Sequence, residues 1–477
     1  MTVSSDDMVF RKSVIQTDTP GNGGRKGSTQ VMSGVRHALF PRVTAASLTA
    51  GLTRVRKEFL CNENESDESA EGVMVHLMRP SNAEDRFYIA KGTQTDIFSE
   101  FDRATYPYAR TWMGAGQLND AVGAGSGEVS LAMEDSDYQF PQGGYLYLSD
   151  NTMVSQTIDA DVKIGDSVYF SGGTWSKVTH TDNITYPYGW CAAADEVLTK
   201  QTTTNEEYLE IATNQYSGES IATGDGSDTN PALSTLTNVT NGICRQAGFL
   251  PTVTATCGSS ERTVAVSEDG VCSGYCSAGE LNMATGAWTT DITWSTAPDN
   301  LSDVEIEYYE NCFSYSGNVA TVELEDQTAN AYTTVGTYGA GCINEEEVAC
   351  AVDSWVETSS AGTFDETTYP LTMYNDGTVE DVFTLTFSDS ANYSVSGTYY
   401  GSVGSGATGT DFSPTNADTG QPYFTLASAG FAGTWASGDT IVFHTSPAGV
   451  PILIEELVPA GTTQEPNNML PIGSYIE

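Results

Sequence analysis

The residues best suited to chemistry in this chain are four histidines, His37, His76, His180 and His444, which are scattered along the sequence. His76 and His444 fall in runs whose alternation is typical of β-strands, so we interpret both as strand residues. No Gly-x-Ser-x-Gly motif is present. Paired carboxylates are too common in so acidic a chain to indicate a reactive pair. We therefore predict no catalytic residues and no enzyme activity.

Two short motifs could offer ligands to a cation, but neither has a specific spacing. The pair Cys272 and Cys276 has no second pair at zinc-site spacing and no histidine beside it. The stretch 225–230, Asp-Gly-Ser-Asp-Thr-Asn, lacks the bidentate Glu of a calcium loop. We predict no metal site and no cofactor, and we expect most of the nine cysteines to be reduced. One or two disulfides within residues 244–350 remain the alternative if the protein matures outside a cell.

Strand signals and glycine-rich turns dominate the elements that would position these residues. Short runs rich in Val, Ile, Thr, Tyr and Phe recur between Gly, Pro, Asn and Asp residues. This pattern predicts a mainly β protein of several small sandwich or barrel domains, with an extended N-terminal arm and one short helix. No apolar run approaches the roughly 18 residues that a membrane-spanning helix needs, and the N-terminus lacks a basic and then apolar leader. We expect neither a transmembrane helix nor a secretory leader.

The N-terminal arm and its helix occupy residues 1–60 in this interpretation, because residues 1–43 are polar and rich in glycine. The expected helix begins after Thr44, a suitable N-cap residue. Its apolar stripe, at helical spacing, consists of Leu48, Leu52, Val55 and Phe59.

Composition and turn signals divide the rest of the chain into five further parts. These are a first β domain at 61–127, a small β unit at 128–200 that could be an insertion, a polar linker at 201–248, a β module at 249–350 and an immunoglobulin-like sandwich at 351–477. Within the β module, Leu281 and Trp288 flank the turn of an expected hairpin.

The last part has the clearest strand pattern. Phe383, Leu385 and Phe387 alternate with threonines, as in a half-buried strand. A turn at Asn375-Asp-Gly precedes this run, and the run 452–454, Ile-Leu-Ile, is placed as a later strand of the same sandwich. About seven short strands in about 100 residues are typical of an immunoglobulin-like domain.

Charge is distributed very unevenly along the chain. The formal net charge is −44, from 63 acidic and 19 basic residues. Residues 1–103 contain 13 Lys and Arg against 14 acids, residues 104–262 contain 6 against 19, and residues 263–477 contain none against 30. This argues against specific nucleic-acid binding, which needs clustered cations. The acidity fits either a saline habitat or an assembly whose inner wall repels DNA.

The basic clusters of the arm are the candidate inter-subunit contacts. They comprise Arg25, Lys26, Arg36, Arg42, Arg54, Arg56 and Lys57. A near-neutral arm joined to an acidic body is expected where the arm of one subunit lies on the body of a neighbour. The alternative, that the arm folds back on its own body, is equally compatible with the sequence.

Several phrases resemble structural proteins of tailed bacteriophages and Mu-like prophages. They are the hairpin phrase at 277–294 and the N-terminal phrases at 39–43, 51–59 and 92–96. The resemblance implies a tail or tail-adjacent subunit, made in the host cytoplasm and located in the virion tail, with no catalytic residues to carry over.

Two functional hypotheses follow. The first is a structural subunit of a bacteriophage virion, a tail tube or tube-adjacent ring component. It would be a homo-oligomer that contacts other virion proteins through its arm, with DNA at most passing through a lumen and no membrane insertion. The alternative is an adhesive fibre or capsid-decorating protein that binds host glycans. In that case exposed aromatic side chains could stack on sugars, the candidates being Trp288, Trp294 and Trp435.

Overall fold

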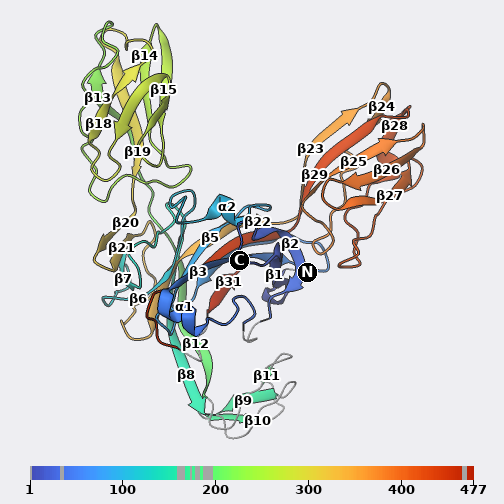
Figure 1. Cartoon of the computed structure of the whole chain (residues 1–477), viewed down its shortest axis with the longest axis horizontal. Coiled ribbons are helices and arrows are strands. Elements are labelled where there is room, and N and C mark those ends of the chain that lie inside the picture. Colours follow the sequence, from blue (N-terminus) through green and yellow to red (C-terminus); the bar gives the residue numbers. More distant parts are fainter. Residues whose placement is uncertain are drawn as a thin grey trace.

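The computed structural model describes residues 3–32, 37–157, 167–171, 174–177, 183–185, 197–464 and 470–476, with side chains outside 151–204. Strands dominate these residues, which confirms the expected mainly β fold. The helical elements described are short: η1 (Ser5–Asp7), α1 (Ala45–Ala50), α2 (Phe98–Phe101) and η2 (Ser428–Gly430). A central body carries two lobes that project from it (Figure 1).

The first sheet of the body has the strand order β2-β1-β3-β30-β5, and all of its neighbours are antiparallel. Its strands are β1 (Met8–Ile15), β2 (Gly23–Gln30), β3 (Leu52–Asn62), β5 (Arg86–Lys91) and β30 (Gly449–Val458). The sheet therefore joins the N-terminal part of the chain to a strand near its C-terminus.

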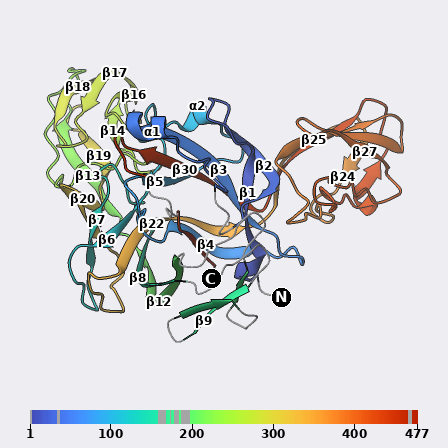
Figure 2. The same cartoon turned by 60° about the horizontal axis from the view of Figure 1, so that its bottom comes forward.

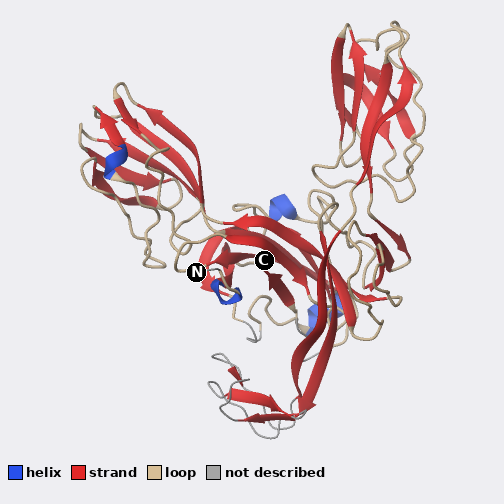
Figure 3. Ribbon diagram, turned by 180° about the vertical axis from the view of Figure 1, so that it is seen from behind, coloured by secondary structure: helices blue, strands red, loops and turns tan. Residues whose placement is uncertain are grey.

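The second sheet of the body has the order β12-β8-β22-β6-β7-β21-β20, and β4 pairs with both β22 and β31. Its strands are β4 (Ala70–Leu77), β6 (Ala115–Leu118), β7 (Glu128–Met133), β8 (Tyr145–Thr157), β12 (Val197–Glu210), β20 (Phe313–Ser316), β21 (Val319–Glu323), β22 (Thr337–Val348) and β31 (Ile472–Tyr475). A long hairpin of β8 and β12 leads away from the body (Figure 3). It ends near a small sheet of β9 (Ser167–Ser171), β10 (Thr174–Lys177) and β11 (Asn183–Thr185).

A shared apolar core holds the two sheets of the body together. One buried cluster contains Leu60 and Ile452 from the first sheet and Val75 and Ile343 from the second. Such face-to-face packing of alternating side chains is the basis of a β-sandwich.

The first lobe, residues 214–310, is a two-layer β structure inserted between β12 and β20. Its five-stranded sheet has the order β13-β19-β14-β15-β16, and a two-stranded sheet pairs β17 with β18. The strands are β13 (Asn214–Thr223), β14 (Thr252–Cys257), β15 (Ser260–Val266), β16 (Cys272–Gly274), β17 (Cys276–Leu281), β18 (Trp288–Trp294) and β19 (Asp303–Glu310). The expected hairpin is present, with Leu281 opposite Trp288.

The second lobe, residues 351–446, is inserted between β22 and β30 and stands apart from the body in a second view (Figure 2). Its sheets have the orders β23-β29-β25-β26-β27 and β24-β28. The strands are β23 (Ala351–Thr358), β24 (Gly362–Phe364), β25 (Asp381–Phe387), β26 (Asn392–Gly397), β27 (Gly401–Ala407), β28 (Phe431–Gly433) and β29 (Thr440–Ser446). Phe383, Leu385 and Phe387 lie in its buried core, as their alternation predicts.

The expected helix after Thr44 is correct only in its first turns. Thr44 caps α1, since its side chain accepts a hydrogen bond from the Ser47 N–H. The helix ends at Gly51, whose φ of 83° lies in the left-handed region. Three residues of the predicted helical stripe instead lie in strand β3: Leu52, Val55 and Phe59. β3 lies between β1 and β30, and pairing with strands so distant in sequence outweighs a local helical periodicity.

The predicted division into consecutive domains is also wrong in several places. Residues 1–60 do not form a free arm in the described part, because β1, β2 and β3 are strands of the body. The first β domain at 61–127 is not independent: β4 and β5 belong to different sheets. The linker at 201–248 contains most of β12 and all of β13, and the polar residues of β13 suit a strand whose side chains are largely exposed or half-buried.

The run 452–454 lies in β30 of the body rather than in the C-terminal sandwich. Ile452, Leu453 and Ile454 are each fully buried. Three successive buried residues require burial on both faces of a strand, which a strand inside the body satisfies and an alternating sandwich strand does not.

Candidate functional site

Three of the predicted contact residues, Arg54, Arg56 and Lys57, are buried on β3, with exposed fractions of 6%, 3% and 0%. Each has an acidic partner in the same chain. Arg54 pairs with Glu456 of β30, Arg56 lies 2.7 Å from the Asp18 carboxylate, and Lys57 Nζ lies 2.5 Å from Asp96 Oδ1. Buried charges require such partners, so these three residues stabilise their own body. Of the two interpretations of the arm, the described residues follow the one in which it folds back.

Further ion pairs continue this pattern inside the body. Asp96 also lies 2.6 Å from Arg110, and Glu455 lies 2.8 Å from Arg103. Arg103 stacks on Tyr88, with its guanidinium carbon 3.7 Å from the ring centroid. The Lys and Arg side chains of the N-terminal part thus form ion pairs with acids of β30 and of the neighbouring loops.

The remaining predicted contact residues have different surroundings. Arg25 reaches the second lobe: its Nε donates a hydrogen bond of 2.9 Å to the Glu380 carbonyl, and its guanidinium lies 4.4 Å from the Tyr399 ring centroid. Lys26 lines a cavity of about 300 Å³ between the body and that lobe. Arg42 is exposed. Arg36 lies outside the described residues.

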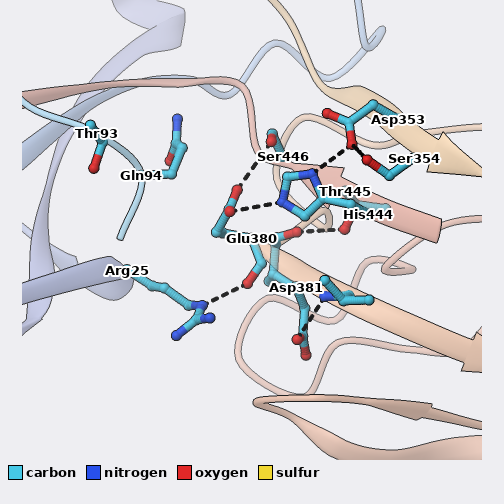
Figure 4. Close-up of polar contacts among 12 residues, drawn as sticks. Arg25, Thr93, Gln94, Asp353, Ser354, Glu380, Asp381, His444, Thr445 and Ser446 are labelled. Atoms are coloured by element: carbon cyan, nitrogen blue, oxygen red, sulfur yellow. Dashed lines mark hydrogen bonds and ion pairs between the residues drawn. The ribbon is translucent and has the colours of Figure 1, made fainter. Parts of the chain in front are cut away.

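The junction that Arg25 reaches contains a histidine held between two acids (Figure 4). His444 Nε2 lies 2.8 Å from Glu380 Oε1, and His444 Nδ1 lies 3.1 Å from Asp353 Oδ1. Ser446 Oγ donates a 3.0 Å hydrogen bond to the second Glu380 oxygen. Strand register explains the arrangement, since Asp353 and Val382 flank His444 on the neighbouring strands β23 and β25. His444 therefore joins the edge strand β23 to the segment that precedes β25.

Partial burial lowers the pKa of His444, but hydrogen bonds and charge from Glu380 and Asp353 outweigh it and raise the pKa above its ordinary value. A protonated imidazole can donate to both carboxylates at once, whereas a neutral one donates from a single nitrogen. The serine hydroxyls here bind the carboxylates rather than the imidazole, Ser354 donating to Asp353 and Ser446 to Glu380. The imidazole of His444 can therefore hold a proton and link β23 to the segment before β25. Neither Ser354 nor Ser446 is positioned as a nucleophile activated by His444.

The same junction is fixed by backbone and amide contacts. Gln94 Nε2 donates a 2.8 Å hydrogen bond to the Gly449 carbonyl, where the chain returns to the body. The N–H of Asn375, in the predicted turn, donates a 2.8 Å hydrogen bond to Asp67 Oδ1 of the body. Its side-chain amide donates to the Glu68 carbonyl at 2.9 Å. The Asn-Asp-Gly sequence predicts the turn but not its role at the junction. The partners of Asn375, Asp67 and Glu68, are 308 and 307 residues away in sequence.

The other histidines and the metal motifs have structural surroundings. His76 is buried on β4 and stacks on Tyr147 at 3.8 Å, and burial lowers its pKa to about 3. His37 lies in an exposed loop, and His180 lies outside the described residues. No group of three or more His, Cys, Asp or Glu in the described residues could hold a metal ion. The Asp225 side chain accepts hydrogen bonds from the backbone of its own turn, at Ser227 and Asp228.

The cysteines that the structure describes are all free. They are Cys61, Cys244, Cys257, Cys272, Cys276, Cys312, Cys342 and Cys350. Cys191 lies outside the described residues. The alternative of disulfides within 244–350 is therefore not realised in this structure.

The tryptophans proposed for sugar stacking belong to the lobe cores. Trp294 and Trp435 are only 2% and 3% exposed, and Trp288 packs against the core of the first lobe. Trp435 stacks on Phe387 with centroids 4.2 Å apart. Strand positions that face a lobe core bury Trp294 and Trp435, so these two residues present no stacking surface to a glycan, whereas Trp288 is half-buried.

Comparison with known proteins finds no matching family model, no matching curated protein and no matching solved structure. In the described part of the chain, no helix has the length and apolar character needed to cross a membrane.

Proposed function

We propose that this chain is a structural subunit of a bacteriophage virion, a tail component that forms a ring or tube-adjacent layer with copies of itself. The sequence resemblance to tail-adjacent proteins supports the proposal, as does the division into a body and projecting lobes. Such a division lets the body pack with its copies while the lobes reach other virion proteins.

The observation that carries the proposal is the separation of charge. Cations of the N-terminal part are paired within the body, through Arg54, Lys57 and Arg103 among others. The second lobe, by contrast, contains no Lys or Arg, and the first lobe contains only Arg245 and Arg262. Acidic lobes repel a phosphate backbone, so DNA could pass along an assembly of such subunits without being retained.

The assembly would use the body rather than a free basic arm. Arg54 and Lys57 cannot meet a neighbour without leaving buried pairs, which costs about 3–5 kcal/mol for one broken pair, and Arg56 is itself buried. Arg42 is exposed and stays a candidate contact to an acidic surface of the next subunit.

Electron microscopy of the phage particle that encodes this chain tests the proposal. The expected result is a ring or stacked rings of this chain in the tail, with the bodies in mutual contact. Mass spectrometry of purified particles is the accompanying control, since a virion subunit must be recovered in stoichiometric amounts. Absence of the chain from purified particles would refute the proposal. A position on the capsid, or at a tail tip with the second lobe free, would favour the adhesive or decorating protein.

A further inference from the structure

The junction between the body and the first lobe contains a cavity of about 450 Å³. Its lobe wall comes from the loop 240–246 and from the turn at Met283 and Ala284. Its body wall comes from Tyr108, Gln139 and the strand β20. A volume of this size falls within the range of about 300–1,000 Å³ that is typical of small-molecule sites.

The walls of this cavity are held in place by hydrogen bonds across the junction. Gln246 Nε2 donates to the Phe140 carbonyl at 2.7 Å, and Gln246 Oε1 accepts the Gln142 N–H at 3.0 Å. Within the body wall, the Tyr315 hydroxyl donates to the Tyr138 carbonyl at 2.9 Å. Because these contacts already fix the walls of the cavity, ligand binding would not carry the entropic cost of ordering them.

Arg245 is the cation of this cavity, and its guanidinium lies 4.6 Å from the ring centroid of Tyr108. Among the described residues it has a ring partner but no carboxylate partner, although the chain contains 63 acids. The ring of Tyr108 fixes the plane of the guanidinium by a cation–π contact and leaves its N–H groups available.

Two acids beside the loop 240–246 accept hydrogen bonds from other groups. Glu310 Oε1 accepts the backbone N–H groups of Thr240 and Asn241, the latter at 2.6 Å. Glu323 accepts the side-chain amides of Asn241 at 3.1 Å and Asn214 at 2.9 Å. Among the described residues that line the cavity, Arg245 is the one charged side chain, and its guanidinium can pair with a negatively charged ligand.

The other lining residues define the chemistry of that guest. Sugar hydroxyls can form hydrogen bonds with the amide and hydroxyl groups of Gln139, Thr240, Asn241, Asn311 and Ser314. Asn241 and Asn311 already donate one N–H each, to Glu323 and to the Asn241 carbonyl, and each amide has a second N–H. Phe313 and Tyr315 are partly buried and provide apolar surface for the C–H face of a sugar ring. An arginine fork binds a carboxylate through two parallel hydrogen bonds.

We propose that this cavity binds a carboxylate-bearing saccharide, such as a uronic or sialic acid unit, with Arg245 on the carboxylate and the amides on the hydroxyl groups. This site is separate from the junction at His444 and does not depend on the proposed virion function. It differs from the sugar-stacking surface expected at the three tryptophans, two of which are buried in the lobe cores.

Calorimetry or ligand-observed NMR on the full chain tests the proposal, with an oligosaccharide that carries a terminal uronic or sialic acid and with its neutral methyl ester. We expect binding of the acid form and at least a tenfold weaker affinity for the ester. Arg245→Ala should weaken binding of the acid at least tenfold, and Arg245→Lys should restore only part of it, because a lysine lacks the fork.

Arg262→Ala is the matched control. Arg262 lies in the same lobe and stacks on Tyr275 at 4.7 Å, but it does not line the cavity. Its removal should leave binding unchanged, and circular dichroism of both variants checks that the fold is retained. Failure of every carboxylated saccharide to bind would overturn the proposal. So would equal binding by Arg245→Ala and the unaltered chain, or binding of acetate or an acidic peptide as tight as that of the saccharide.

Discussion

At the scale of single residues, Glu58 of β3 is a carboxyl group in a buried position. Burial raises its pKa from 4.5 to about 8, although Lys12 and Arg56 act in the opposite direction. A carboxyl group whose pKa is higher in the folded chain binds its proton more tightly there than in the unfolded chain. The stability that this provides is complete below pH 4.5 and is lost as pH rises toward about 8.

We predict that Glu58→Gln removes this loss. Between about pH 5 and pH 8 the unaltered body should lose up to about 1.4 kcal/mol of unfolding free energy per pH unit from this group. The glutamine variant should be more stable than the unaltered chain at pH 8.5 and similar to it at pH 4.5. Urea unfolding at several pH values measures both. An identical pH dependence in the two proteins would contradict the assignment to Glu58.

The pKa of His444 is also raised on folding, so its contribution to stability changes with pH in the same direction as that of Glu58. Its pKa is raised above 6.5 in the folded chain, so the stability conferred by the protonated imidazole is complete below pH 6.5. That stability is lost as pH rises through the raised value. We expect amides of β23 and β29 to exchange more slowly at pH 6 than at pH 9, after correction for intrinsic rates, and His444→Asn to remove the difference. His37→Asn, in an exposed loop, is the control variant and should keep it.

At the scale of elements, the pairing of β3 with β30 depends on Arg54 and Glu456, which lie opposite each other in register. Arg54→Met leaves a buried carboxylate without its partner, and the expected cost is about 3–5 kcal/mol of unfolding free energy. The double variant Arg54→Met with Glu456→Leu removes both charges and should recover most of this loss. Denaturant unfolding measures the three proteins; a cost of less than about 1 kcal/mol for the single variant would show that the pair is not important for stability.

The strands were more predictable than their pairing. Alternation at Phe383, Leu385 and Phe387 is a property of neighbouring residues, and the sequence therefore revealed β25. The position of β30 depends on acids that meet Arg54 and Arg103 from the other end of the chain, and no local pattern contains that information. For the same reason β3 was mistaken for a helix.

The candidate site was less predictable than the fold. His444 was interpreted correctly as a strand residue, but its partners Glu380 and Asp353 lie 64 and 91 residues away. The cluster of basic residues in the N-terminal part was recognised, yet only Arg42 is found exposed among those whose position is described, while the others make contacts within the chain or line a cavity. A cation beside a strand pattern does not show whether its partner is in the same chain or in another.

At the scale of the whole molecule, a net charge of −44 opposes the approach of two copies. Raising the salt concentration from about 0.1 M to about 1 M shortens the screening length from about 10 Å to about 3 Å. We therefore predict that self-association strengthens with salt, as measured by sedimentation velocity at fixed protein concentration. Dissociation of oligomers at high salt would instead indicate that attractive charge contacts, such as one through Arg42, dominate the interface.

Each lobe leaves and re-enters the body through neighbouring strands. Ala351 and Ser446, the first and last strand residues of the second lobe, are register partners, as are Asn214 and Glu310 in the first. Partners in an antiparallel pair are about 5 Å apart, a gap that a two-residue turn can close. Either lobe could therefore be excised or exchanged for an unrelated module without altering the strand order of the body. The surface that the protein presents outward can thus be changed by exchanging one lobe, while the strand pairing of the body stays the same.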